Sequence, residues 1–411
     1  MRKLLIILIL ISISFIPNHA TSVKNHVFDC IVAQDGTGNY TTIQDAIDQA
    51  PKNSKHPYLI FIKAGHYHEH INIPTNKPML HLIGQGQELV RISDDRVSGG
   101  PNASPVDVAA TVVSNGTDEY FEGITFENSW GTRHNEGPQA LALYTKEDRN
   151  IVNKCKMLSF QDTYRTANEI NQRNYVKDCF IQGGIDFIYG QGNVYFDHCT
   201  LNIVKKDGGW IVAPKHMPGT TWGYVLKNTI ITAPGNPKDT RVWLGRPWLH
   251  SPMAVFIDTQ SKVTIPDSGW YDHMASIPKI YADYNTMDAN NKPLDLSHRI
   301  CMYYMITEKG DTIWGKAKNH LTSEEAAQYT ISNVMGGIDH WKPDMICRQL
   351  PAIKCNLDRG HLFWKPVNQA RGYIIYQDNK MLSTSTATSI VVPKGHQYTV
   401  KAVSYNGTIG L

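Results

Sequence analysis

A six-residue pattern recurs through the middle of the chain: an apolar residue, two mostly polar residues, a small or amide residue, a variable residue and a second apolar residue. It occupies residues 121–126, 152–157, 176–181, 196–201 and 225–230, whose starts are 31, 24, 20 and 29 residues apart. The segments are short, rich in β-formers and different at odd and even positions, which indicates strands. Repeats of this length are typical of solenoids. The pattern therefore predicts a parallel β-helix, in which each coil buries its inner face against its neighbours.

Three cysteines, Cys155, Cys179 and Cys199, occupy the same place in consecutive repeats. Strands about 4.8 Å apart bring equivalent side chains close to disulfide range, and Cys179–Cys199 is the favoured pair. A ladder of buried thiols is an equally good alternative. The chain has seven cysteines, so at least one is unpaired or pairs between chains. No CxxC and no Cys/His ligand spacing occurs, which argues against a metal site built on cysteine.

Two segments have helical periodicity. Residues 41–50 place Thr41 and Gln44 as a capping box, and this helix is expected to cover the N-terminal end of the solenoid. Residues 322–335 begin with a second box, Thr322 with Glu325, and are expected to pack near the C-terminal end.

From about Pro343 the chain alternates like a sandwich, over residues 362–366, 372–376 and 398–403. This stretch of fewer than 70 residues resembles a fibronectin type III module, abbreviated or incomplete, with a spacer or docking role. The predicted organisation is a signal peptide at 1–20, a β-helix catalytic domain at 21–342 and this module at 343–411.

The first twenty residues read as a targeting segment. Arg2 and Lys3 precede an apolar run, Leu4 to Ile16, and Ala20 suits a cleavage site. The run is too short to span a bilayer, so we expect a cleaved signal peptide and a secreted or periplasmic protein, with an uncleaved anchor as the alternative. No later stretch is long enough to cross a membrane.

Composition narrows the classes of partner. Apolar residues make up 41%, aromatic residues 10% and charged residues 19% of the chain, which excludes intrinsic disorder. The formal charge is +3, or +1 without Arg2 and Lys3, which excludes a strongly basic nucleic-acid platform.

Two aspartates, Asp162 and Asp186, are 24 residues apart, about one coil. Carboxylates that meet on one face cannot both ionise freely, so one can stay protonated as an acid while the other acts as a nucleophile or base. The alternative is a pair of turn aspartates that stabilise loops.

Four further side chains add to this picture. Gln139 and Gln161 are 22 residues apart, again one coil, and their amides could donate to one oxyanion, although an inward amide ladder is the alternative. Arg246 could fork onto a carboxylate, and Trp248 could stack on a sugar ring. A surface arginine and a core tryptophan are the alternatives for these two.

Five segments occur in a fixed order: GHYHE at 65–69, QALAL at 139–143, QDTY at 161–164, DFIYG at 186–190 and LGRPW at 244–248. They resemble the blocks GxYxE, QAVAL, QDTL, DFIFG and LGRPW of the pectin methylesterases, or pectinesterases. The resemblance runs from about Phe28 to Trp341. It implies an all-β fold, a right-handed parallel β-helix, that hydrolyses the methyl esters of polygalacturonate (pectin) without a metal or organic cofactor.

The resemblance also implies roles. Asp186 would be the nucleophile, and Asp162 would protonate the departing methoxide and then activate water. Gln139, assisted by Gln161, would stabilise the oxyanion, and Arg246 would orient Asp186. Trp248 would contact the sugar, and Tyr189 and Tyr164 would line the groove; these eight are the predicted site residues.

Two other functions compete with this one. A β-helix lyase or glycosidase acting on pectin is one, but a lyase needs an acidic Ca²⁺ cluster that the sequence does not offer. A non-catalytic carbohydrate-binding protein is the other. We expect methyl-esterified homogalacturonan as partner, no nucleic acid, and a monomer by default.

Overall fold

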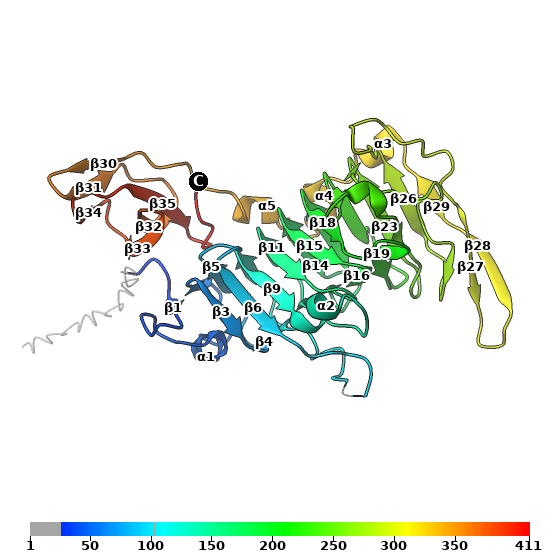
Figure 1. Cartoon of the computed structure of the whole chain (residues 1–411), viewed down its shortest axis with the longest axis horizontal. Coiled ribbons are helices and arrows are strands. Elements are labelled where there is room, and N and C mark those ends of the chain that lie inside the picture. The colour runs from blue at the N-terminus through cyan, green and yellow to red at the C-terminus, as the bar shows by residue number, and fades with distance from the viewer. Residues whose placement is uncertain (1–25, 102) are drawn as a thin grey trace, which may run out of the picture.

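The computed structural model describes residues 26–101 and 103–411, so the predicted signal peptide at 1–20 lies outside the described residues. Three parallel sheets wind around a common axis, and successive strands of the chain enter them in turn (Figure 1). The fold is the predicted parallel β-helix. Within the described ranges, no helix is long and apolar enough to cross a membrane.

The first sheet has eleven parallel strands, one from each coil. They are β1 (Cys30–Val32), β2 (Tyr58–Ile62), β5 (Leu80–Gly84), β8 (Tyr120–Glu122), β11 (Asn150–Asn153), β14 (Arg173–Lys177), β17 (Asn193–Asp197), β20 (Tyr224–Lys227), β23 (Met253–Ile257), β26 (Ile280–Tyr284) and β29 (Lys318–His320). We call it sheet A.

Two further sheets complete each coil. Sheet B contains β3 (Gly65–His68), β6 (Val90–Asp94), β9 (Thr125–Asn128), β12 (Lys156–Leu158), β15 (Phe180–Gly183), β18 (Thr200–Ile203), β21 (Ile230–Thr232) and β24 (Gln260–Ser261). Sheet C contains β4 (Ile71–Ile73), β7 (Val112–Ser114), β10 (Leu143–Thr145), β13 (Tyr164–Thr166), β16 (Ile185–Gly190), β19 (Gly209–Pro214) and β22 (Val242–Gly245).

Each six-residue repeat spans two strands rather than one. It holds the end of a sheet A strand and the start of a sheet B strand, and the bend between them is a residue with positive φ, such as Lys154 (50°), Asp178 (52°) or His198 (54°). The prediction of one strand per repeat was therefore wrong in this detail. The register also aligns Phe196 with Leu226, one residue later than the predicted repeat start at 225.

The row of cysteines is a ladder of free thiols in the core, so the favoured Cys179–Cys199 disulfide was wrong and the alternative was right. The Cys155 N–H donates to Cys179 Sγ at 3.4 Å, and the Cys199 thiol donates to the Val176 carbonyl at 3.4 Å. Burial raises the pKa of Cys155 and Cys199 to about 12, which suits small apolar side chains and opposes thiolate chemistry.

Helix α1 (Ile43–Gln49) covers the N-terminal end of the solenoid, as predicted, and buries Ile43 against the first strands. Its cap is Thr42, which accepts from the Asp45 N–H, and not the predicted Thr41. The Glu69 carboxylate also accepts the N–H groups of residues 43 and 44 at 3.0 Å. Two short helices lie further along, α2 (Ser129–His134) and the 3-10 helix η1 (Pro237–Asp239).

The predicted helix at 322–335 is two helices. The Thr322–Glu325 capping box is present and starts α3 (Ser323–Ala326), but a second cap at Thr330 starts α4 (Ile331–Met335). Helix α4 packs on β14 and β17, in the middle of sheet A, and α5 (Pro343–Ile346) follows. The predicted packing near the C-terminal end is therefore wrong for α4, because the segment turns back along sheet A.

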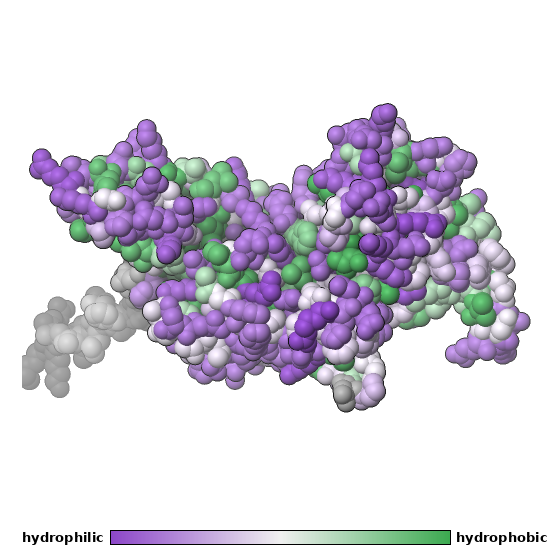
Figure 2. Space-filling model, viewed as in Figure 1, coloured by the Kyte–Doolittle hydropathy of each residue, from purple (hydrophilic) through white to green (hydrophobic). Residues whose placement is uncertain are grey.

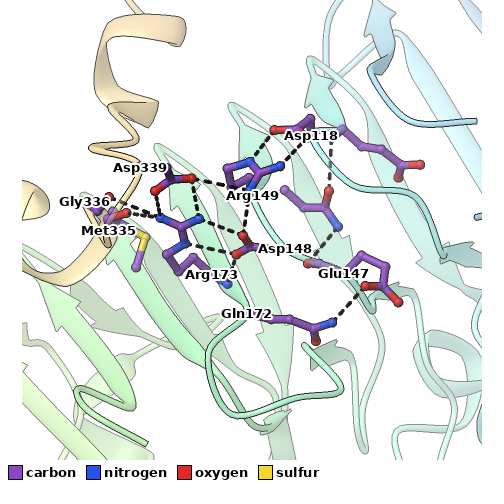
Figure 3. Close-up of polar contacts among 11 residues, drawn as sticks. Asp118, Glu147, Asp148, Arg149, Gln172, Arg173, Met335, Gly336 and Asp339 are labelled. Carbon is purple, nitrogen blue, oxygen red and sulfur yellow. Dashed lines mark hydrogen bonds and ion pairs between the residues drawn. The ribbon is translucent and has the colours of Figure 1, made fainter. Parts of the chain in front are cut away.

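An ionic network fastens this returning segment to the solenoid (Figure 3). The Arg173 guanidinium donates to Asp148 at 2.7 Å, to Asp339 at 2.9 Å and to the Met335 carbonyl at 3.0 Å. Arg149 adds bonds to Asp118 at 2.8 Å and to Asp148 at 3.0 Å. Hydrogen bonds between charged groups are stronger than neutral ones, so the network fixes the segment after α4.

The C-terminal strands form two antiparallel sheets of three strands over one apolar core. The strands are β30 (Cys355–Asp358), β31 (His361–Trp364), β32 (Ala370–Gln377), β33 (Lys380–Ser385), β34 (Ser389–Val391) and β35 (Tyr398–Ser404). Figure 2 shows the molecule hollowed between these strands and the region of α3.

The tail after β35 lies beside β5 and β8 of sheet A (Figure 1). The His81 Nδ1–H donates to the Asn406 carbonyl at 2.8 Å, and the Ile409 N–H donates to the buried Glu122 carboxylate at 3.2 Å. Thr408 is fully buried and donates to the Ile346 carbonyl at 2.8 Å. The C-terminal strands are therefore attached to the solenoid by a packed, hydrogen-bonded contact.

Candidate active site

The two predicted aspartates lie on adjacent coils of sheet C. A parallel bridge between Gln161 and Ile185 sets the register, so Asp162 lies alongside Asp186. Both aspartates have positive φ, 61° and 48°, a conformation that Asp adopts more readily than most residues. Their exposed fractions are 8% and 7%. Asp162, just before β13, and Asp186, at the start of β16, thus each present a carboxyl group in a nearly dry environment.

Arg246 holds Asp186 with two parallel hydrogen bonds, from Nε to Oδ1 at 2.8 Å and from Nη2 to Oδ2 at 2.5 Å. The arginine directly follows β22, and its own N–H donates to the Val212 carbonyl at 3.0 Å. Its carbonyl accepts from the Tyr281 hydroxyl at 2.8 Å. Because the backbone N–H and carbonyl of Arg246 are both hydrogen-bonded, its main chain is fixed. The two parallel bonds from its guanidinium then hold the Asp186 carboxylate in one orientation.

The surroundings separate the protonation states of the pair. Burial, followed by the negative charge of Asp186, raises the pKa of Asp162 well above its usual value. Burial also raises the pKa of Asp186, but the hydrogen bonds and charge of Arg246 oppose this rise. The arrangement therefore favours a protonated Asp162 beside an ionised Asp186, one acid and one nucleophile or base.

The two glutamines occupy the same stack of coils. The Ala140 N–H donates to the Gln161 carbonyl at 3.1 Å, which sets Gln139 one coil from Gln161. Gln161 directly precedes Asp162 in the chain. Both glutamines are half-buried. Loop backbone approaches them closely, since a Cβ on Gly99 would lie 2.6 Å from Gln139 Oε1. Gln161 therefore shares a coil with Asp162, and Gln139 lies on the preceding coil.

Trp248 and Tyr189 lie together on the outer face of sheet C. Their ring centroids are 5.6 Å apart, and Lys215 Nζ lies 5.8 Å from the Trp248 ring. Tyr189 belongs to a small apolar cluster on this face. Burial and the neighbouring charge of Asp162 raise the pKa of the Tyr189 phenol well above its usual value. Tyr189 is only 3% exposed and Trp248 is half-buried, so an apolar sugar face could rest on Trp248, with Tyr189 packed beside it.

Tyr164 does not line this surface, so its predicted contact with substrate was wrong. Its side chain is fully buried in the core, edge-on to Phe196, and its hydroxyl is 2.9 Å from Thr145 Oγ1. The reason is the positive φ of Asp162, which turns the chain before β13 and sends residue 164 inward.

Two residues near the site were missed. Arg165 is only 5% exposed, donates to Asp107 at 2.8 Å, and opposes the rise in the pKa of Asp162. Trp210 lies under Arg246, with the guanidinium carbon 3.9 Å from its ring centroid. The coil offset offered a signal for Trp210, because it pairs with Ile185 on the next strand.

The sequence model of the family described as Pectinesterase matches residues 29–337, three quarters of the chain. The chain belongs to the pectinesterase family. The pectinesterase match ends before β30, so the C-terminal strands lie outside it.

Curated pectinesterases are moderately similar. A pectinesterase/pectinesterase inhibitor of Prunus persica is 33% identical over 256 residues, covering 59% of this chain and 47% of the relative. Probable pectinesterase 56 of Arabidopsis thaliana is 31% identical over 250 residues, covering 59% and 84%. Pectinesterase 1 of Solanum lycopersicum is 29% identical over 304 residues, covering 70% and 53%. The chain thus spans about half the length of several curated relatives.

Solved pectin methylesterases share the fold. The carrot enzyme superposes with a TM-score of 0.62 at 24% identity, covering 77% of this chain and 95% of that one. The Aspergillus niger enzyme superposes with a TM-score of 0.59 at 25% identity, covering 75% and 93%. The predicted right-handed parallel β-helix is confirmed by this likeness.

Proposed function

We propose that this protein is a carboxylic ester hydrolase that converts the methyl esters of polygalacturonate to free carboxylates and methanol. The observation that carries the proposal is the Asp186 carboxylate, held by the Arg246 fork beside the protonated Asp162. The pectin methylester class of substrate comes from the names of the similar structures and relatives. A weak carboxylate nucleophile needs this combination of a fixing cation and a neutral acid.

In the first half-reaction, an Asp186 oxygen attacks the ester carbonyl carbon. The amides of Gln139 and Gln161 donate to the oxyanion that forms. As the tetrahedral intermediate collapses, Asp162 gives its proton to the departing methoxide, and methanol leaves. The galacturonyl group is then joined to Asp186 as an anhydride.

In the second half-reaction, Asp162 is ionised and takes a proton from water. The resulting hydroxide attacks the same carbonyl carbon, and collapse expels the Asp186 carboxylate, which Arg246 receives again. The proton taken from water leaves Asp162 in its acid form for the next turnover, and the sugar carboxylic acid is released and ionises in water. Trp248, supported by the adjacent ring of Tyr189, would hold the sugar during both steps. No step requires a metal or organic cofactor.

Methanol release from methyl-esterified pectin tests this proposal. Asp186→Asn is expected to abolish release, and Asp162→Asn to lower kcat by roughly 10²–10⁴-fold. Asp178→Asn is the matched control, because Asp178 has a similar φ of 52° in a bend on the same solenoid. No methanol from folded wild type between pH 5 and 9 would contradict the proposal and favour a lyase, a glycosidase or a binding protein.

We further infer that residues 343–411 form a fibronectin type III-like module. Support comes from the strand order β30–β31–β34 and β33–β32–β35, two antiparallel sheets over a core in which Trp364 meets Tyr373 at 5.2 Å. We also propose export to the periplasm or the outside of the cell, from the predicted signal peptide, and a monomer in solution.

A further inference from the structure

A line of aromatic rings leads away from Arg246 along one face of the molecule. Trp210, under the arginine, is 5.3 Å from Tyr271, and Tyr271 is 4.7 Å from His273. His273 stacks on Tyr304 at 4.5 Å with an interplanar angle of 13°, and Tyr304 is 4.9 Å from Trp314. A continuous series of contacts therefore runs from Asp186 through Arg246 to Trp314. We call the five rings of Trp210, Tyr271, His273, Tyr304 and Trp314 the aromatic strip.

The strip rests partly on a small separate sheet that lies next to the last strand of sheet C. Three strands, β25 (His273–Met274), β27 (Met302–Ile306) and β28 (Thr312–Lys316), form a small sheet in that order. The Tyr271 N–H donates to the Gly245 carbonyl at 3.0 Å, and the Ala275 N–H donates to the Pro247 carbonyl at 3.2 Å. Both acceptors belong to the LGRPW segment of the active site, so the backbone that holds Arg246 also positions the strip.

The outer end of the strip is open to solvent. Strands β27 and β28 form a hairpin that projects beyond the coils (Figure 1), and Figure 2 shows apolar residues gathered on it. Trp314 is 59% exposed, and Ile306, on the same face of the hairpin as Tyr304, is 60% exposed. Large apolar side chains gathered at the surface mark an interaction site more often than isolated ones do.

Charge distinguishes among the molecules that could cover the strip. At its inner end, Lys205 Nζ lies 5.6 Å from the Trp210 ring and the Arg241 guanidinium carbon lies 4.9 Å from the neighbouring Trp243 ring. Asp272 is the acidic group beside it, and it is bonded to His273 at 2.6 Å. Flat rings with adjacent cations suit a polymer that offers apolar sugar faces and carboxylates in alternation.

We propose that the aromatic strip is an extended binding surface for de-esterified stretches of the polygalacturonate chain. This inference rests on the proposed esterase function and adds the part of the polymer that the enzyme holds outside the reacting sugar.

Binding of fully de-esterified polygalacturonate tests the strip without any reaction, by titration calorimetry of the full chain. Trp314→Ala is expected to weaken binding roughly two- to tenfold, the range for one aromatic contact, and Tyr304→Ala/Trp314→Ala to weaken it further. Trp314→Leu keeps apolar bulk if the alanine variant folds poorly. Tyr405→Ala, which removes a 64% exposed ring on the C-terminal tail, is the matched control.

Kinetics supply the second measurement. The ratio of kcat/KM on methyl-esterified polymer to kcat/KM on a methyl-esterified trimer is expected to fall two- to tenfold in Trp314→Ala, mainly through KM. Unchanged polymer binding and an unchanged ratio would overturn the proposal, even if methanol release is normal. A loss of dimers by light scattering without either change would also overturn it and identify the hairpin as a contact between copies. Failure of the esterase proposal would be distinguishable, because the wild-type protein would then release no methanol from either the polymer or the trimer.

Discussion

At the active site, two chemically identical carboxyl groups lie one coil apart and meet different surroundings. Asp186 accepts two hydrogen bonds from Arg246, whereas the nearest charged neighbour that raises the pKa of Asp162 is Asp186 itself. Desolvation acts on both groups, so the arginine is what makes them differ. The different protonation of the two residues therefore depends on a third side chain, 60 residues from Asp186 in sequence.

Arg246→Ala should move the whole pH–rate profile to higher pH. Arg246 lowers the pKa of both aspartates, so its removal raises both. The acidic limb, where activity is lost as Asp186 becomes protonated, shifts upward, and so does the alkaline limb, where Asp162 loses its proton. We also expect kcat/KM to fall roughly ten- to a hundredfold, as for a lost hydrogen bond to a charged group. The measurement is the pH dependence of kcat/KM for methanol release.

The matched control is Arg348→Lys, a change at an exposed position between α5 and β30. If the acidic and alkaline limbs of the pH–rate profile do not shift in Arg246→Ala, the arginine does not set the protonation of the two aspartates.

The residue scale also shows what the sequence can and cannot predict. Coil offsets placed Asp162 beside Asp186 and Gln139 beside Gln161 correctly, because the hydrogen-bonded register of parallel strands is regular. Side-chain direction failed at Tyr164, because the positive φ of Asp162 resets the alternation between inward and outward positions. A shift in register between Ile185 and Ile188 does the same in β16, and Tyr189 faces outward after it. Asp tolerates positive φ better than most residues, but nothing in the sequence marks which aspartates adopt it or where the register shifts.

At the scale of elements, the bends of the coil were the features hardest to foresee. Lys154 and His198 adopt positive φ without being glycine, and each divides what looks like one strand into two. The start of helix α4 was equally hard to predict, since Thr330 caps a new helix where the helical pattern of residues 322–335 continues unbroken. Stacking on sheet A overrides local preference in both cases.

Asp339→Asn should remove an acid-sensitive part of the stability. Arg173 lowers the pKa of Asp339 to about 2, so the pair stabilises the fold above the unfolded pKa of about 4 and loses this effect as the pH falls towards 2. Because Asp339 is 38% exposed, solvent screening limits the effect to about 1 kcal/mol. Urea unfolding at pH 7 and pH 3 measures it: the difference between wild type and variant should shrink at pH 3.

Asp358→Asn, at an exposed position in β30, serves as the comparison and should change little at either pH. An equal loss of stability in Asp339→Asn at pH 7 and pH 3 would point to altered packing instead of a lost ion pair.

At the scale of the molecule, the C-terminal strands and the solenoid share a buried contact. Burial raises the pKa of Glu122 and lowers that of His81 to about 4, and both groups bond to the tail that follows β35. Polar groups buried in this way are tolerated when their partners are in place. The sequence indicated a sandwich-like module, but not this contact, because its partners are 287 to 325 residues apart.

Gly407→Ala tests whether this contact joins the two parts into one cooperative unit. Gly407 has a φ of +92°, and an added Cβ would lie 2.8 Å from Ile83 of sheet A. Gly395→Ala is the matched control: its φ is +84° in the same group of strands, and an added Cβ meets nothing within 4 Å. Both variants carry backbone strain of roughly 1–2 kcal/mol, but only Gly407→Ala should also displace the tail.

By calorimetry we expect wild type and Gly395→Ala to unfold in one transition and Gly407→Ala in two, the first from the C-terminal strands. Two transitions in wild type would instead mean that the tail contact is too weak to couple the C-terminal strands to the solenoid.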